Sequence, residues 1–168
     1  MRHTTFRFAL DPTLVQEQAL SRHTGASRFA YNQSLRLVTD ALAANRVDPS
    51  VPVPWSGFDL INAFNAWKRT EEAGRVFVVA RDGTVTKHVT GLPWQQQVAA
   101  QVFEEAAVDL GRALSAYTQA KNGERKGRQP GFPRFKRKGR CRDSFRLRNR
   151  QSRGSGFRIR VGEGHPAR

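Results

Sequence analysis

The stretch that decides the fold reads QPGFPRFKRKGR (129–140), followed by SFRLRNR (144–150) and FRIR (157–160). Apolar side chains alternate with cations along much of it. Because alternate side chains of a strand point to opposite faces, Phe145 and Leu147 would share one face and their neighbouring arginines the other. We therefore expect a sheet whose inner face is apolar and whose outer face is covered by guanidinium groups.

Positive charge is concentrated in this part of the chain. Residues 1–119 carry 12 Lys and Arg against 11 Asp and Glu, whereas residues 120–168 carry 17 against 3, within a formal net charge of +15. Guanidinium forks match phosphate geometry, so the simplest partner is a nucleic-acid backbone. A charge run can also be only a solvated face, but the single sign and the interleaved aromatics favour nucleic-acid contact. The candidate contacts are Arg125, Lys126, Arg128, Arg134, Lys136, Arg137, Lys138, Arg140, Arg146, Arg148, Arg150, Arg158 and Arg160.

The N-terminal half predicts one strand followed by helices. Residues 5–10 alternate as a strand with Phe6, Phe8 and Leu10 inward. Asp11-Pro12 then reads as a helix start, with the helix running to about His23 and stopping at Gly25. A second helix begins at about Ala26, with Tyr31, Leu35, Val38 and Leu42 on one stripe.

The middle of the chain predicts two more helices and a hairpin. Residues 58–69 are expected to form a helix with Leu60, Phe64 and Trp67 on one side. Residues 75–90 contain two β-branched runs around Asp82-Gly83, which indicates a hairpin. The longest helix is expected from Pro93 to about Gln119. Its packing seam would be Ala99, Phe103, Ala106, Leu110, Ala113 and Tyr117.

Together these elements predict an α+β fold. An isolated N-terminal strand needs partners, and potential strands are plentiful only after Gly131. We expect a small antiparallel sheet or barrel whose first strand (1–11) is separated from the rest (125–168) by a helical insertion at 12–124, with a possible hairpin at 75–90.

Two residues of the second helix are candidates for base recognition. Arg28 and Asn32 are four residues apart and share a helix face. Arg and Asn are common readers of guanine and adenine edges. The alternative is that Asn32 hydrogen-bonds internally, and both interpretations stay open for Arg28 and Asn32. Tyr31, between them, is expected to pack in the helical core.

Other functional classes find little support in the residues. Cys141 is the only cysteine and the four histidines are scattered, so we assign no metal site and no cofactor to this chain. No catalytic residue is assigned, and the chain is not expected to be an enzyme. The sequence has no apolar run of the roughly 20 residues that span a bilayer and no secretory signal, so we expect a cytoplasmic protein without a membrane partner. The oligomeric state is not predicted.

Several short motifs resemble one family. They are FRFALDPT (6–13) with Gln16 and Gln18, GASRFAYN (25–32), DLGRA (109–113) and GFPRFK (131–136). With these motifs in this order, the chain resembles the N-terminal part of the TnpB family, the OrfB-type proteins of bacterial insertion sequences. That region was formerly described as a helix-turn-helix transposase domain, and the family also resembles type V CRISPR effectors.

The resemblance implies a wedge-type β-barrel split by a helical recognition domain. It implies binding of a guide RNA scaffold and of double-stranded DNA beside a target. The family's metal-dependent nuclease domain and zinc ribbon would lie beyond Arg168, so we expect either a truncated gene or a fragment. The alternatives are a stand-alone DNA-binding regulator, similar to a repressor, and a remnant without function.

Overall fold

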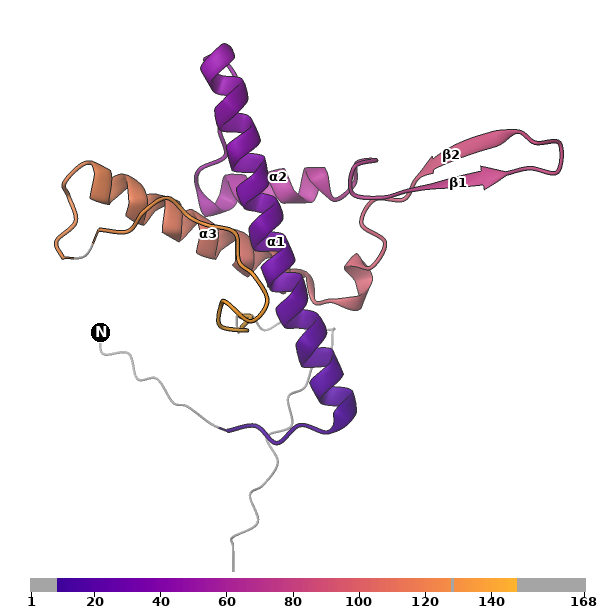
Figure 1. The fold of residues 1–168 in the computed structure, drawn as a ribbon, viewed down its shortest axis with the longest axis horizontal. Helices are drawn as coiled ribbons and strands as arrows, with labels where there is room; N and C mark the ends of the chain where they lie inside the picture. The colour runs from indigo at the N-terminus through magenta and orange to yellow at the C-terminus, as the bar shows by residue number, and fades with distance from the viewer. Residues whose placement is uncertain (1–8, 128, 148–168) are drawn as a thin grey trace, which may run out of the picture.

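The computed structural model describes residues 9–127 and 129–147. Its chain order is helix, helix, hairpin, short turn of 3₁₀ helix and helix (Figure 1). This arrangement confirms the α+β class. The elements are α1 (Leu14–Val47), α2 (Gly57–Trp67), β1 (Arg75–Val79), β2 (Val85–Val89), η1 (Gln95–Gln97) and α3 (Ala100–Lys121).

Helix α1 is one continuous helix of 34 residues, so the predicted stop at Gly25 is wrong. A glycine in a helix interior costs about 1 kcal/mol, which is not enough to end a helix when tertiary packing continues on both sides. Here Ala26 and Ala30 are buried immediately after it. The start also differs from the prediction, because Thr13 caps the helix in a reciprocal box with Gln16.

The three helices enclose the core. Helix α3 packs against both α1 and α2, and α1 crosses α2 (Figure 1). The predicted apolar stripe of α2 is confirmed, and that of α1 is confirmed except that Leu42, at its end, is only half-buried. The predicted seam of α3 is confirmed at its centre and half-buried near its C-terminal end. Buried residues of these stripes are Tyr31, Leu35, Val38, Leu60, Phe64, Trp67, Phe103, Ala106 and Leu110.

Helices α2 and α3 meet backbone to backbone where α2 begins. A Cβ atom at Gly111 would lie 2.6 Å from the amide nitrogen of Gly57 and 2.9 Å from its Cα. Such distances leave no room for a side chain. Gly111 therefore sets how closely the two helices approach.

The segment before α3 differs from the predicted long helix. The prediction started the helix at Pro93, whereas α3 begins at Ala100. The chain before Ala100 takes another path: the Leu92 amide donates to the Lys68 carbonyl at 2.8 Å, residues 95–97 form the 3₁₀ turn η1, and the Trp94 ring packs on Phe103 of α3. At the other end, Gly123 adopts a φ of 76°, a left-handed conformation that ends the helix.

The hairpin at 75–90 is confirmed. Strands β1 and β2 are antiparallel, with Arg75 opposite Val89 and Val79 opposite Val85. The hairpin projects away from the helices (Figure 1), and every residue of both strands is exposed.

After α3 the chain turns back beside that helix and then runs along α1 as an irregular segment (Figure 1). We call residues 129–147 the basic strap. The strap contains no strand, so the strand predicted to begin at Ser144 is not formed over 144–147. Instead Phe145 and Leu147 pack directly on the helical core, where an extended segment needs no neighbouring strand.

The predicted barrel remains a prediction. The part of its first strand with Phe6 and Phe8, and its last strand, with Phe157 and Ile159, lie outside the described residues. Leu10, which was predicted to point inward, lies in coil ahead of α1 and is 55% exposed, so the prediction is wrong at this residue. Among the helices that are described, none is long and apolar enough to cross a membrane.

Candidate nucleic-acid interface

The basic strap is held to the helices by aromatic contacts near its two ends. Phe132 meets Tyr117 of α3 edge-on, with ring centroids 5.4 Å apart. Phe145 lies 5.3 Å from the ring of His23 on α1. His23 is itself buried and fixed in the helix, because its Nδ1 lies 2.7 Å from the carbonyl of Ala19 and donates to it when protonated. Apolar packing thus sets the path of the strap.

Asn32 of α1 binds the middle of the strap. Its amide nitrogen donates to the carbonyl of Lys136 at 2.9 Å, and its amide oxygen accepts from the Lys136 amide at 2.8 Å. The side chain therefore completes both hydrogen bonds of one strap residue, as a neighbouring strand would. This is the internal hydrogen bonding that the sequence left open for Asn32.

Tyr31 packs in the core as expected and also receives the side chain of the same lysine. The ammonium nitrogen of Lys136 lies 3.9 Å from the centre of the Tyr31 ring, within range of a cation–π interaction. Burial, with a smaller contribution from Asp109, raises the pKa of the Tyr31 phenol. The ring is thus neutral and acts as a platform.

Arg28 binds the strap seven residues further along. Its guanidinium Nη1 lies 2.6 Å from Oδ1 of Asp143. Asp143 is the only carboxylate in the sequence between Arg125 and Leu147. The ion pair therefore neutralises the one negative charge of the otherwise cationic strap.

Between these two attachments the strap forms a tight turn, residues 137–142, which we call the basic turn. The amide of Arg140 donates to the carbonyl of Arg137 at 3.1 Å, and Gly139 has a φ of 74°. Four of its six residues are cationic and all four are exposed. None of the four pairs with a carboxylate of the described residues. They are Arg137, Lys138, Arg140 and Arg142.

Arg146 lies differently. Its guanidinium contacts Asp109 at 3.1 Å and Glu105 at 3.4 Å, both on α3. Glu105 is buried, whereas half of the arginine side chain is exposed. Arg146 thus joins the strap to α3 through carboxylates.

The structure places the predicted contact residues in three groups. Arg125, Lys126, Arg134 and the basic turn are exposed, while Arg28, Asn32, Lys136 and Arg146 hold the strap in place. Arg142 was missed by the sequence reasoning, although its position beside Arg140 in the same cation run could have indicated it. Outside the described residues lie Arg128, Arg148, Arg150, Arg158 and Arg160.

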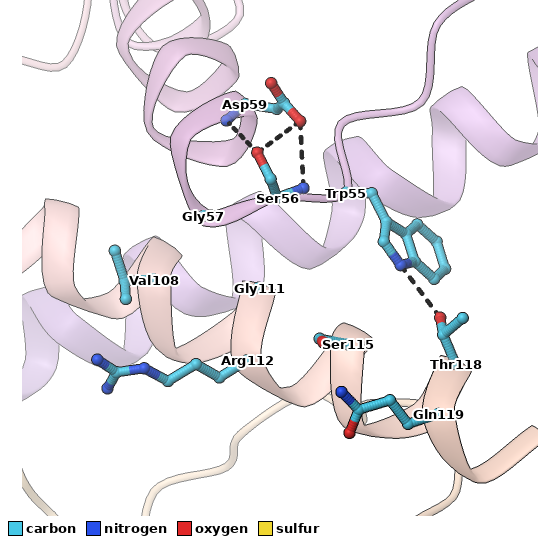
Figure 2. A pocket seen from close by; sticks show the side chains of 10 residues that line it. All are labelled: Trp55, Ser56, Gly57, Asp59, Val108, Gly111, Arg112, Ser115, Thr118 and Gln119. Carbon is cyan, nitrogen blue, oxygen red and sulfur yellow. Dashed lines mark hydrogen bonds between the residues drawn. The ribbon is translucent and has the colours of Figure 1, made fainter. Parts of the chain in front are cut away.

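A hollow of the described surface lies elsewhere, between the start of α2 and α3 (Figure 2). It has a volume of about 530 Å³. Two pairs of its polar residues are bonded within the lining: Trp55 donates to Thr118 at 3.2 Å, and Ser56 caps α2 with Asp59. Hydrogen bonds from the Ser56 hydroxyl and amide lower the pKa of Asp59. Among the described residues we find no group of three or more potential metal ligands.

The start of the chain matches a known family model. Residues 1–46 match the family model described as a helix-turn-helix domain, of the OrfB type associated with IS605. Over these residues the chain is similar to an OrfB-type helix-turn-helix domain. Over residues 9–46 of the match, however, the OrfB-type segment folds as coil and the single helix α1, not as two helices joined by a turn.

Two curated relatives support the same family. Both are from Mycobacterium tuberculosis, strains CDC 1551 / Oshkosh and ATCC 25618 / H37Rv, and both are named provisionally as RNA-guided DNA endonucleases. Each is 28% identical over 138 residues, which are 82% of this chain and 27% of the relative. The chain thus spans about a quarter of the length of the relatives it matches. No solved structure matches it. The OrfB-type match and these relatives together support nucleic-acid binding.

Proposed function

We propose that this chain binds the sugar–phosphate backbone of nucleic acid through the basic turn, with Arg125, Lys126 and Arg134 as further exposed cations of the binding surface. One observation carries the proposal. The cations of this surface are exposed and without carboxylate partners among the described residues, and the one acid of the segment is held by Arg28. Arg and Lys side chains in this state are available to phosphate oxygens.

The binding mechanism is charge neutralisation. Each phosphate neutralised by a cation releases condensed counterions into solution, so affinity falls as salt rises. If about six phosphates are neutralised, the logarithm of the association constant should fall with the logarithm of salt concentration at a slope of roughly −4 to −5.

The partners we propose are a guide RNA and duplex DNA beside a target, met in the cytoplasm. The names of the two relatives support this choice of partners. We further propose that these 168 residues bind but do not cut. In support, the acidic residues after residue 119 are Glu124, Asp143 and Glu163, well separated in the sequence, whereas two-metal cleavage needs carboxylates gathered around the ions. Divalent metal and zinc would then be held by other parts of the full-length protein.

The test is a salt titration by fluorescence anisotropy, with a duplex DNA and a structured RNA as probes. Replacing Lys138 or Arg140 by Ala should weaken binding to both probes, and the salt slope should become less steep by about 0.9 for each phosphate that is no longer neutralised. Arg81→Ala, in the turn that joins β1 to β2, is the matched control and should leave the slope unchanged. The hairpin projects away from the helices and from the strap (Figure 1).

Two results would overturn the proposal. Affinity that stays flat between low and moderate salt would remove phosphate neutralisation as the mechanism. Equal losses of affinity for Lys138→Ala and Arg81→Ala would show non-specific attraction to the whole positive chain instead of a surface at the basic turn. Cleavage is assayed in parallel with added magnesium; cutting that depends on an acidic residue of this chain would contradict the non-catalytic role.

A further inference from the structure

We infer that α1 holds the basic turn in its binding conformation before nucleic acid binds, and that Arg28 and Asn32 are positioning residues for this binding. They would act through the strap, without contacting bases. The inference rests on the proposed function. It concerns which residues of the site touch the ligand and which only hold the residues that do.

The geometry of the attachments carries this inference. Asn32 fixes Lys136, the residue just before the basic turn, by two hydrogen bonds of 2.8 and 2.9 Å. Arg28 fixes Asp143, the residue just after the turn, at 2.6 Å. The turn is therefore clamped at both ends by one face of a single helix. Tyr31, on the same helix, receives the side chain of Lys136.

Clamping matters because binding by a flexible segment carries an ordering cost. A turn that already holds its cations together loses less conformational entropy when it meets phosphates, so its affinity is higher for the same number of phosphate interactions. The amide nitrogen and the amide oxygen of the Asn32 side chain are both bonded to the backbone of Lys136. The side chain is therefore unsuited to bidentate recognition of adenine.

Arg28 has a second effect, which is electrostatic. An uncovered Asp143 would lie next to Arg142 in the chain and compete with phosphate for the cations of the basic turn. Arg28 engages this carboxylate and only 18% of its own side chain is exposed. Arg28 then contributes to binding by neutralising the Asp143 carboxylate, which would otherwise compete with phosphate for the cations of the basic turn.

The first experiment tests the clamp in the absence of nucleic acid. Trypsin cuts after Arg and Lys, so the rate of cleavage of the full chain after Lys136, whose amide and carbonyl are both bonded to Asn32, reports how often the strap leaves α1. Asn32→Ala should accelerate this cleavage by about tenfold, the effect expected when hydrogen bonds to a segment are removed. Gln18→Ala, an exposed amide of the same helix, is the matched control and should leave the rate unchanged. An unchanged rate in Asn32→Ala would refute the clamp.

The second experiment separates positioning from direct contact. Asn32→Ala should weaken binding of the duplex and RNA probes with an unchanged salt slope and an unchanged ranking of probe sequences, because no phosphate or base contact is removed. A turn variant such as Lys138→Ala makes the slope shallower instead. If Asn32→Ala changes the preference among sequences, Asn32 reads a base and the inference is wrong.

The third experiment uses rescue. Arg28→Gln should weaken binding, because it uncovers Asp143, and Arg28→Gln combined with Asp143→Asn should recover most of the affinity. A double variant as weak as Arg28→Gln would show that Arg28 contacts the nucleic acid itself. Failure of the proposed function gives a different pattern: the parent would show no salt-dependent binding, while the trypsin experiment would still report on the clamp.

Discussion

The close approach of α2 and α3 gives a prediction in which one chemical change has opposite effects at two places. Gly111 and Gly25 both lie inside helices, so Gly→Ala brings the same gain in helix propensity at each, about 1 kcal/mol. The two sites differ only in their surroundings. A Cβ at Gly25 meets nothing within 4 Å, whereas a Cβ at Gly111 meets the backbone of Gly57 at 2.6 Å.

The magnitude at Gly111 follows from what must move. Because the obstacles are backbone atoms of Ser56 and Gly57, no side-chain rotation relieves the overlap and α2 has to shift away from α3. Overpacking of this kind costs about 1–3 kcal/mol, and we place a backbone obstacle at the upper end of that range. After the gain in propensity, Gly111→Ala should lose about 2 kcal/mol of the free energy of unfolding. Gly25→Ala should gain about 0.4–1 kcal/mol.

Thermal and urea melts followed by circular dichroism measure both variants. At about 2–4 °C per kcal/mol, Gly111→Ala should melt roughly 4–8 °C below the parent. Gly25→Ala should melt up to about 4 °C above it. If Gly111→Ala is as stable as the parent, the helices do not meet as described. If Gly25→Ala is destabilising, α1 is not continuous there.

Three further predictions concern the core, the start of α1 and the base of the hairpin. Phe64→Ala should lower the free energy of unfolding by about 3–5 kcal/mol in urea melts, because the ring is buried between α2 and α3; Phe58→Ala, on the exposed side of α2, should change it little. Thr13→Ala should lower the free energy of unfolding by about 1 kcal/mol in the same assay, while Asp11→Ala should change it by nothing measurable. A larger loss for Asp11→Ala than for Thr13→Ala would show that Asp11 caps the helix, as the sequence predicted. Hydrogen bonds from Lys87 and Arg75 lower the pKa of Glu71, so its stabilisation of the hairpin is present above the ordinary carboxyl pKa and is lost as the pH falls through the lowered value. The protection factors of the β1 and β2 amides, which correct exchange rates for the intrinsic rate at each pH, should fall on acidification in the parent, and a Glu71→Gln variant with the same acid response would contradict this.

Sequence reasoning succeeded where local patterns decide the outcome. The apolar spacing of Leu60, Phe64 and Trp67 predicted the buried side of α2, and the turn residues Asp82-Gly83 predicted the hairpin. Both signals lie within a few residues of the structure they specify, and no distant segment competes with them.

It failed where distant residues decide. Gly25 weakens a helix locally, but burial of the following residues against another helix keeps α1 continuous. The alternation at 144–147 places Phe145 and Leu147 on the core, and an extended segment lying on helices satisfies it as well as a strand does. The partners of Arg28 and Asn32 lie 115 and 104 residues further along the chain, a separation that no local pattern reveals.

The exposed hairpin has a thermodynamic consequence of its own. In the part of the chain that the structure describes, β1 and β2 pair only with each other, and none of their side chains is buried. Two strands without a hydrophobic face against a third element are marginally stable in water. The hairpin should therefore open and close while the helices stay folded, as a separate cooperative unit. The molecule then has two stabilities, a small one for the hairpin and the global one for the helical core, and a single melting temperature describes only the second.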